Sequence, residues 1–201
     1  MSIAPIGIFG GTFDPIHYGH LRLAQELGES LRLAEVRIVP AGRPPHRAAP
    51  QVTAEQRLEM VRLAVAGNAL LAVDDREFRR AGPGYTVDTL RELRREVGNS
   101  RPLCLLLGAD AFLDLATWHQ WHELFGLAHL VIAWRPGFPP ETWPARMPEP
   151  LAREYEKRLL RQPFGIHLSP AGGIVAQPIA ALDISATMIR DSLARDVSPR
   201  Y

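Results

Sequence analysis

Residues able to bind phosphate gather in the first twenty positions. The apolar residues 6–9 lead into a short segment that ends in two histidines. Adjacent glycines after a buried strand let the backbone approach a ligand, because no Cβ stands in the way. Pro15 favours a helix start there, and the free amides and dipole of such a helix attract phosphate. On that helix the histidines, three positions apart, share one face. The segment therefore predicts a triphosphate site, and its candidate ligands are Gly10, Gly11, Thr12, Phe13, His17 and His20.

A second group of phosphate-binding types stands near the C-terminus. Ser185 and Thr187 lie where a helix should begin, and they offer hydroxyls and free amides. Arg190, one turn further on, brings a fixed cation to the same place. Taken alone, this segment reads more readily as a capped helix with a solvated arginine. Together with the N-terminal group it favours a shared phosphate site.

A third group lies in the loop after the second predicted strand. His46 and Arg47 follow two prolines there, and Arg135 follows the fifth predicted strand. Two cationic donors on a stiff loop suit a phosphomonoester. A surface loop in an arginine-rich chain would have the same composition, so this group is open on its own.

Two of these segments carry a family resemblance that spans nearly the whole chain. Residues 10–20 resemble the T/HxGH signature of the nucleotidylyltransferase superfamily, in the form GGTFDPIHxGH of bacterial nicotinate mononucleotide adenylyltransferases. Residues 184–190 are similar to that family's ISSTxIR motif, although Ala186 removes one hydroxyl. The resemblance implies ATP binding by both segments, Ile184 included. It also implies catalytic roles for His17, His20 and Arg190.

The same resemblance implies a site for nicotinate mononucleotide. The PPH[KR] pattern around His46 and Arg47 would hold its phosphate, and Trp118 would stack on its pyridine ring. An aromatic face suits a pyridinium through stacking and cation–π attraction, although core packing is the default for a tryptophan alone. The substrate residues that the resemblance implies are His46, Arg47, Tyr85, Thr86, Gly108, Asp110 and Trp118. Arg135, after the fifth predicted strand, is a fourth and weaker candidate for binding a phosphate.

The implied reaction is transfer of the adenylyl group of ATP to nicotinate mononucleotide, giving deamido-NAD and pyrophosphate. Mg²⁺ would arrive with ATP and keep most of its waters. No protein metal site is expected, because His119, His122 and Glu123 lack a convincing further ligand.

Three alternatives remain open. The first is an enzyme for nicotinamide mononucleotide, or for both acceptors, which would use the same ATP site. The second is a phosphopantetheine adenylyltransferase, which lacks the PPH[KR] loop and the GAD…W pairing. The third is a non-catalytic nucleotide sensor, which would have no need of transition-state donors such as His17 and His20.

Composition narrows the class of protein further. The 201 residues carry a formal net charge of +1 with no basic block, so neither nucleic acid nor a membrane surface is an expected partner. The sole cysteine, Cys104, lies in an apolar run and excludes an internal disulfide. Neither a signal peptide nor a membrane span is expected, which favours the cytoplasm. A homo-oligomer remains possible.

The pattern of the chain predicts one domain over residues 1–201, a Rossmann-like α/β fold with a doubly wound parallel sheet and crossover helices. Helices are expected from Thr53, over residues 86–97 and from near Ser185. Residues 136–150, with six prolines, are expected to form an irregular surface loop. Strands are expected near residues 5–9, 35–40, 70–74, 103–107, 129–134 and 174–178.

Overall fold

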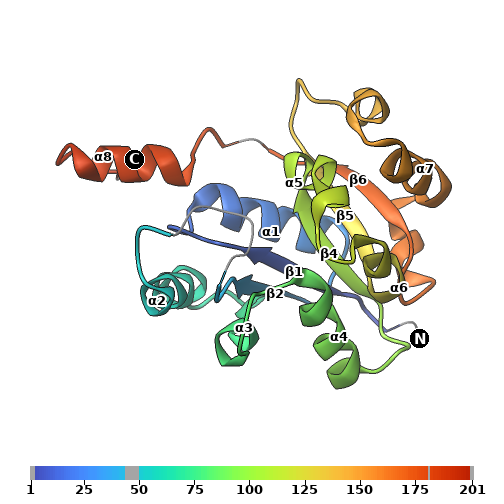
Figure 1. Ribbon diagram of the computed structural model, residues 1–201, viewed down its shortest axis with the longest axis horizontal. Coiled ribbons are helices and arrows are strands. Elements are labelled where there is room, and N and C mark those ends of the chain that lie inside the picture. The colour runs from blue at the N-terminus through green and yellow to red at the C-terminus, as the bar shows by residue number, and fades with distance from the viewer. Residues whose placement is uncertain (1–2, 44–49, 181, 200–201) are drawn as a thin grey trace.

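The computed structural model describes residues 3–43, 50–180 and 182–199. In this part of the chain six strands form one sheet, with all neighbours parallel, in the order β3-β2-β1-β4-β5-β6 (Figure 1). Every strand lies within two residues of its predicted place, and the order confirms the doubly wound fold. The strands are β1 (Ile6–Gly11), β2 (Glu35–Pro40), β3 (Leu71–Val73), β4 (Leu103–Gly108), β5 (His129–Trp134) and β6 (Ile174–Pro178).

Helices follow the strands, and several connections close with short 3-10 turns. The helices are α1 (Tyr18–Ser30), α2 (Ala54–Val65), α3 (Arg76–Arg79), α4 (Thr86–Val97), α5 (Ala109–Leu113), α6 (Leu124–Leu127), α7 (Glu149–Arg158) and α8 (Ala186–Ala194). The 3-10 turns are Leu115–Thr117, Trp121–Glu123, Pro140–Thr142, Pro144–Arg146 and Pro163–His167.

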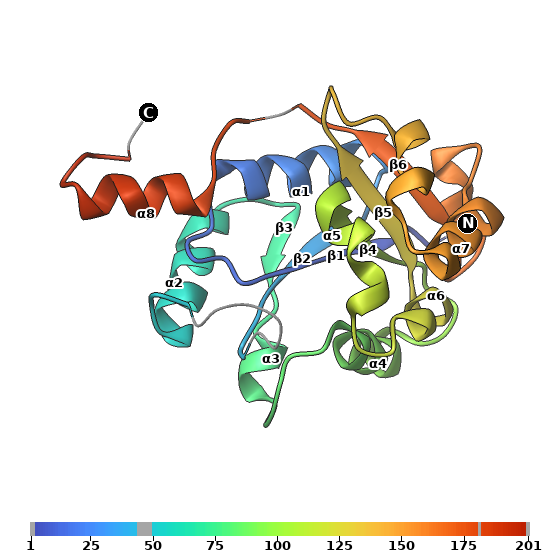
Figure 2. The same ribbon diagram turned by 45° about the horizontal axis from the view of Figure 1, so that its top comes forward.

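Apolar side chains cover both faces of the sheet, as a parallel sheet requires. Helices α1 and α2 pack Leu27 and Val61 on one face, and α4 and α5 pack Leu90 and Phe112 on the other. Figure 2 shows α1 and α4 on opposite sides of the strands. Cys104 of β4 is fully buried, and this burial raises the pKa of its thiol to about 12, as expected of an inert cysteine.

Two helix boundaries follow the predicted capping signals. Thr53 accepts a hydrogen bond from the amide of Gln56, and the Gln56 side chain accepts one from the amide of Thr53, which together form a capping box. Gly98 ends α4 with φ of 82°, a conformation that favours glycine.

The start of the first helix differs from the prediction. Pro15 lies outside α1, which begins at Tyr18 with His17 as its N-cap residue. His17 is therefore the N-cap residue of α1 and His20 its third residue, so only His20 lies within the helix, but the two rings do lie side by side as predicted. The turn before α1 is consequently longer than the sequence suggested.

The proline-rich segment 136–150 is also more than a surface loop. Trp143 lies between its two 3-10 turns and is fully buried, with its indole ring beside Phe112 and Tyr155. The indole N–H donates to the carbonyl of Phe138. The prediction of an exposed loop was wrong here, because one large aromatic side chain anchors the segment in the core.

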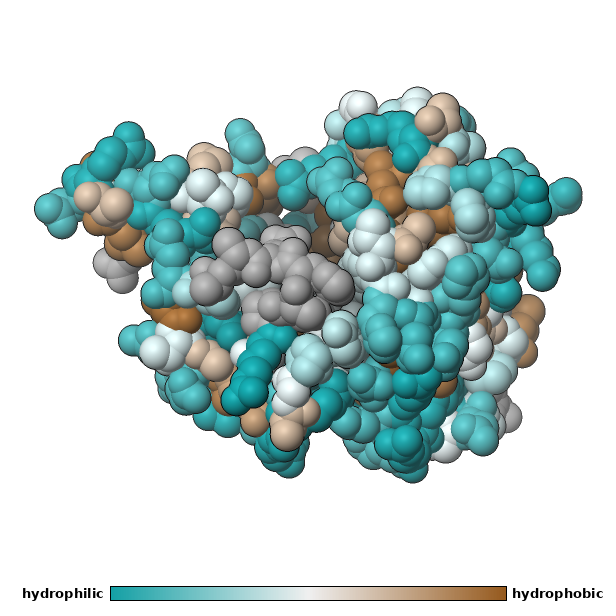
Figure 3. All heavy atoms as spheres, in the orientation of Figure 1, coloured by the Kyte–Doolittle hydropathy of each residue, from teal (hydrophilic) through white to brown (hydrophobic). Residues whose placement is uncertain are grey.

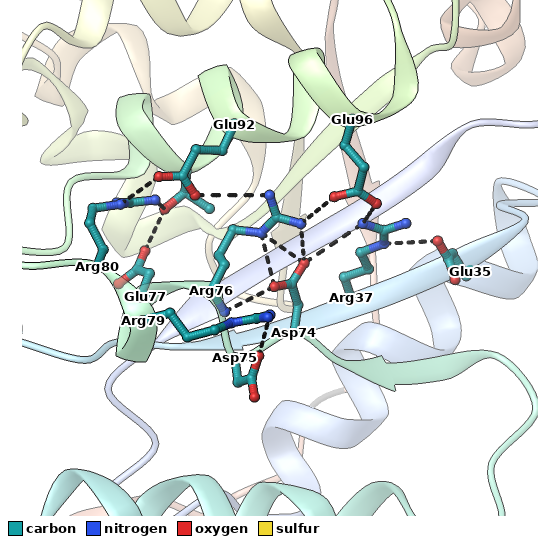
Figure 4. A network of polar contacts seen from close by, with 11 residues as sticks. Glu35, Arg37, Asp74, Asp75, Arg76, Glu77, Arg79, Arg80, Glu92 and Glu96 are labelled. Carbon is teal, nitrogen blue, oxygen red and sulfur yellow. Dashed lines mark hydrogen bonds and ion pairs between the residues drawn. The ribbon is translucent and has the colours of Figure 1, made fainter.

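An ion-pair network joins β2, β3, α3 and α4 (Figure 4). Asp74 directly follows β3, is largely buried, and accepts hydrogen bonds from Nε and Nη2 of Arg76. The Arg76 and Arg37 guanidiniums each contact Glu96 of α4 at 2.7 Å. The network thereby fixes α4, whose first residues are predicted substrate contacts.

Helix α8 projects from the body at the left of Figure 1, and none of its side chains is buried. Met188 and Leu193 expose about half of their surface, and Figure 3 shows apolar side chains among polar ones on this helix. None of the helices in the described ranges has the length and apolarity needed to cross a bilayer.

Candidate active site

The topological switch point of the sheet lies between β1 and β4, which are neighbours. Open α/β sheets bind ligands in the crevice at this point, beyond the carboxyl ends of the strands. The turn after β1 holds Thr12 and Phe13, and Gly108 ends β4 beside it in the sheet. We call residues 12–17, between β1 and α1, the triphosphate turn, after their predicted role. This turn and Gly108, one of the predicted substrate residues, thus lie at the ends of the two strands that flank the crevice.

The two glycines before the turn belong to β1 itself. Gly10 and Gly11 pair with Val39 and Pro40 of β2, so the prediction that they come after the strand was wrong. A Cβ on Gly11 would stand 2.8 Å from the ring of Phe13. Glycine at position 11 therefore lets the chain fold back tightly at the end of β1.

Phe13 gives the turn its shape. Its φ is 49°, in the left-handed region that bulky residues rarely adopt. The ring is buried and meets Phe9 and His20 edge-on, with ring centroids 5.6 and 5.1 Å away. Burial of this ring stabilises a turn whose backbone conformation is intrinsically unfavourable.

His17 and His20 lie against each other at the start of α1. Their rings stack with centroids 3.7 Å apart and an angle of 29° between the planes. Nδ1 of His20 accepts a hydrogen bond from the backbone amide of His17 at 3.3 Å. Because Nδ1 is the acceptor, a neutral His20 carries its proton on Nε2 and donates from that atom.

The position of His17 disfavours its charged form. Burial lowers the pKa of the His17 imidazole, and the positive charge of Arg135 lowers it further. Nδ1 of His17 is buried without a hydrogen-bond partner in the described residues. Arg135 itself is exposed after β5, and its effect on His17 places its charge near the triphosphate turn.

Gly19, between the two histidines, lies close against the ring of His17 and next to the C-terminal segment. A Cβ on Gly19 would stand 3.0 Å from Nδ1 of His17 and 3.5 Å from the carbonyl oxygen of Ile184. Ile184 also lines a groove between α1 and α2, together with Tyr18, Leu21 and Ala64. The two predicted ATP segments are thus in contact, although they come from opposite ends of the chain.

Arg190 joins the same turn. Its Nη1 donates to the carbonyl oxygen of Asp14 at 2.6 Å, and its Nη2 donates to Oγ1 of Thr187. Ser185 is the N-cap residue of α8, and its hydroxyl accepts the amide of Met188. The structure therefore supports the capped helix and also brings Arg190 to the triphosphate turn.

The loop that begins at Ala41 borders this turn from β2. His46 and Arg47 lie outside the described residues, but both flanks of the loop are described. The amide of Gly84 donates to the carbonyl of Arg43, and the amide of Gln51 donates to the Asp14 carboxylate. The loop is thus attached to the predicted substrate segment at one end and to the triphosphate turn at the other.

The remaining predicted substrate residues lie on three neighbouring elements. Tyr85 and Thr86 cap and begin α4, and Asp110 is exposed on the first turn of α5. Trp118 is half-buried and packs against the core next to α5. The ring of Tyr85 stacks on His119 at 4.3 Å, which links the α4 segment to the Trp118 segment.

Sequence reasoning missed Arg57 on α2. Its side chain is 1% exposed and donates to the carbonyl oxygens of Thr12, Ala41 and Gly42. Burial lowers the pKa of this guanidinium, and the Asp14 carboxylate opposes that shift. The sequence did contain a signal for its burial. Arg57 stands four residues before Val61 and eight before Val65, on the side of α2 that the helical period predicts to face the core.

A model of the cytidylyltransferase-like family matches residues 8–192. "Probable nicotinate-nucleotide adenylyltransferase" of Dechloromonas aromatica (strain RCB) is 54% identical over 98% of this chain and 90% of its own. The protein of the same name from Halorhodospira halophila (strain DSM 244 / SL1) is 52% identical, over 98% of this chain and 87% of its own. The chain belongs to the cytidylyltransferase-like family.

A solved structure supports the same family fold. The nicotinic acid mononucleotide adenylyltransferase of Plasmodium falciparum, complexed with NaAD, matches with a TM-score of 0.71, covering 97% of this chain and 86% of that chain. At 18% identity this match establishes the fold alone. The region that the family model matches contains both segments predicted to bind phosphate, from the turn after β1 to the first residues of α8.

Proposed function

We propose that this chain transfers the adenylyl group of ATP to nicotinate mononucleotide, a step of NAD biosynthesis. The observation that carries the proposal is the convergence of His17, His20 and Arg190 on the turn between β1 and α1. The near full-length relatives that are 54% and 52% identical bear the name of this activity. A site with three cation-capable donors suits a reaction in which negative charge moves between phosphates.

The reaction needs no general base from the protein. A phosphate oxygen of nicotinate mononucleotide attacks the α-phosphorus of ATP and forms the new P–O bond. The bond from the α-phosphorus to the oxygen that bridges to the β-phosphate breaks, and pyrophosphate leaves with that electron pair. The attacking phosphate is already ionised near neutral pH, so catalysis consists of positioning and charge stabilisation.

In this proposal His20 donates from Nε2 to a non-bridging oxygen of the α-phosphate, where charge develops. His17 and Arg190 bind neighbouring phosphate oxygens, and the amides around Thr12 and Phe13 hold the triphosphate. Mg²⁺ accompanies ATP, bound mainly by phosphate oxygens and water. Among the described residues, no three His, Cys, Asp or Glu side chains lie together in a way that could hold a metal ion.

On the acceptor side, Trp118 stacks on the pyridine ring, and Thr86 with nearby backbone amides contacts its carboxylate. Tyr85, Gly108 and Asp110 line the same acceptor site. His46 and Arg47 bind the phosphate of the acceptor. The exposed Arg135 supplies a further positive charge between the two substrates. The attachment of the 41–51 loop to both Gly84 and Asp14 supports this placement.

A pyrophosphate-release assay tests the proposal with ATP and four conditions: nicotinate mononucleotide, nicotinamide mononucleotide, phosphopantetheine or no acceptor. We expect release with nicotinate mononucleotide, at a kcat/KM roughly 10²-fold above that for the amide, because a neutral amide forfeits a charge-assisted hydrogen bond. Comparable values for the two mononucleotides would indicate dual specificity. The proposed substrate would be refuted if phosphopantetheine were the only acceptor that gave release. It would also be refuted if none of the three acceptors raised release above the level without acceptor.

A further inference from the structure

Arg57 is a buried cation that donates hydrogen bonds to three backbone carbonyls. Nη1 donates to Thr12 at 2.7 Å and to Ala41 at 2.6 Å, and Nη2 donates to Gly42 at 3.2 Å. Thr12 belongs to the triphosphate turn, while Ala41 and Gly42 begin the loop proposed to bind the acceptor. One guanidinium from α2 therefore holds the backbones of both substrate sides.

These three bonds fix the orientation of three peptide planes. In a trans peptide the N–H of the next residue points opposite to the carbonyl. With the carbonyls of Thr12, Ala41 and Gly42 directed at Arg57, the amides of Phe13, Gly42 and Arg43 are directed away from it. These amides are the kind of donor that phosphate groups bind.

Other contacts around the same backbone depend on this orientation. Phe13 follows the Thr12 carbonyl in a left-handed conformation, so its peptide plane needs support from outside the turn. On the loop side, the Arg43 carbonyl accepts the amide of Gly84 at 3.1 Å. Arg57 thus supports the turn and the loop at positions where each is also tied to its neighbours.

We propose that Arg57 is a positioning residue for the adenylyl transfer, setting the triphosphate turn and the acceptor loop in register with each other. The inference rests on the proposed function, since it assigns these two segments to the two substrates. In-line attack requires the acceptor oxygen to lie close to the α-phosphorus. Misplacement of reactants by about 1 Å costs roughly 10²-fold in rate.

The chain offers a matched control in Arg94 of α4. Arg94 is also largely buried, and it likewise donates to backbone carbonyls, those of Leu127, Gly98, Arg101 and Pro170. The Pro170 carbonyl also accepts the amide of Leu103, so this cluster lies at the amino end of β4 and away from the crevice. Arg57→Lys and Arg94→Lys make the same chemical change in similar surroundings at opposite ends of the sheet.

The experiment measures kcat, both KM values, the ATP dissociation constant and the melting temperature for wild type, Arg57→Lys, Arg57→Met and Arg94→Lys. A lysine ammonium lacks the planar fork that reaches three carbonyls. We expect both KM values to rise several-fold in Arg57→Lys and kcat to fall about tenfold or more, with a larger loss in Arg57→Met. Per folded molecule, Arg94→Lys should keep both KM values and kcat within about twofold of wild type. The carbonyls that Arg94 contacts lie at the other end of the sheet, away from both proposed substrates.

Each outcome is decisive. Wild-type kinetics in folded Arg57→Lys, with only a lower melting temperature, would make Arg57 a stability residue and overturn the proposal. The proposal would also be overturned if only one of the two KM values rose in Arg57→Lys, since Arg57 would then serve a single substrate. Failure of both Arg57 variants to fold at 4 °C, while Arg94→Lys folds, would assign Arg57 to the folding core. If wild type releases no pyrophosphate with nicotinate mononucleotide, the proposed function fails. Weaker binding of both ATP and nicotinate mononucleotide in Arg57→Lys, but not in Arg94→Lys, would then still support the link between the two segments, and weaker binding of one of them alone would overturn it.

Discussion

Three aromatic rings surround His20 and set the direction in which it donates. His17 stacks on it at 3.7 Å, Phe13 meets it edge-on at 5.1 Å, and Phe9 lies 6.1 Å away. The backbone amide of His17 occupies its Nδ1. A donor held in this way before substrate arrives needs little reorganisation when charge develops in the transition state.

His20→Ala should therefore lower kcat by about 10²–10³-fold, the usual cost of removing one preorganised donor. The ATP dissociation constant should change much less, because an interaction made in the transition state does not contribute to ground-state binding. Single-turnover rates, an ATP titration and a melting curve separate these effects. The exposed His122, which stacks on Trp121, supplies the control variant His122→Ala. Normal turnover per folded His20→Ala molecule would remove this residue from the mechanism.

At this scale the sequence predicts motif residues better than supporting residues. His17, His20 and Arg190 stand in recognisable patterns, and the structure brings them to one turn. Arg57 stands in no phosphate-binding pattern, and one arginine among many carries little information when almost every basic residue is arginine. Only its burial and its three carbonyl contacts distinguish it, and these depend on the folded backbone.

Among the secondary-structure elements, strands and capped helices are well predicted because their signals are local. Apolar runs, the capping box at Thr53 and the glycine at position 98 depend on neighbours within a few residues. The predictions for the start of α1 and for the 136–150 segment were wrong because these features depend on contacts that the local sequence does not show. His17 ends the turn through a contact with His20, and Trp143 enters a core built by distant elements.

The element next to the acceptor loop contains a buried carboxylate that requires glycine around it. Burial raises the pKa of the Glu77 carboxyl, although a hydrogen bond from the Thr89 hydroxyl opposes this shift. A Cβ on Gly84 would stand 2.2 Å from Oε2 of Glu77, and one on Gly42 would stand 2.5 Å from the backbone oxygen of Glu77. Glu77 thus fills the space between the loop and the segment that leads into α4.

Gly84→Ala should raise the KM for nicotinate mononucleotide several-fold, because the new methyl group pushes the Glu77 carboxylate away from Thr89 of α4, the helix that begins at the proposed substrate contacts. The KM for ATP should stay within about twofold, since the triphosphate turn is not touched. Gly126→Ala is the matched control, because a Cβ there meets no atom within 4 Å. Steady-state kinetics with each substrate varied in turn decides the matter. An equal rise of the two KM values in Gly84→Ala would contradict the assignment of this segment to the acceptor.

Across the whole molecule, the site joins the two ends of the chain. Asp14 and Arg190 are 176 positions apart, yet they share a hydrogen bond of 2.6 Å. Helix α8 buries none of its side chains, so its contacts with the turn come from its first residues and Arg190. The fold class was predictable from the alternation of elements, but this meeting of the ends was predictable only through the resemblance to a family.

A second buried histidine links the stability of the whole fold to pH. His129 at the start of β5 is fully buried, with Nε2 donating to the Ser169 carbonyl and Nδ1 accepting the Gly173 amide. Burial lowers its pKa, and the positive charges of Arg94 and His167 add to that shift, while the hydrogen bond to Ser169 opposes it. Protonation of Nδ1 would break the bond to Gly173 and place a charge beside Arg94.

The free energy of unfolding should therefore fall as the pH drops below about 6.5, the ordinary pKa of histidine in an unfolded chain. Because the folded pKa is the lower one, the contribution of neutral His129 is complete above that pH and is lost as the pH falls through the folded pKa. One proton gives a slope of at most about 1.4 kcal/mol per pH unit.

Urea denaturation of wild type, His129→Gln and the surface control His122→Gln between pH 5.5 and 7.5 measures this slope. His129→Gln should be less stable throughout but show a shallower slope, the remainder coming partly from His17, whose pKa is also lowered. Paired carboxylates such as Glu96, whose pKa is lowered, titrate below this window. Identical slopes in wild type and His129→Gln would show that His129 does not link folding to pH.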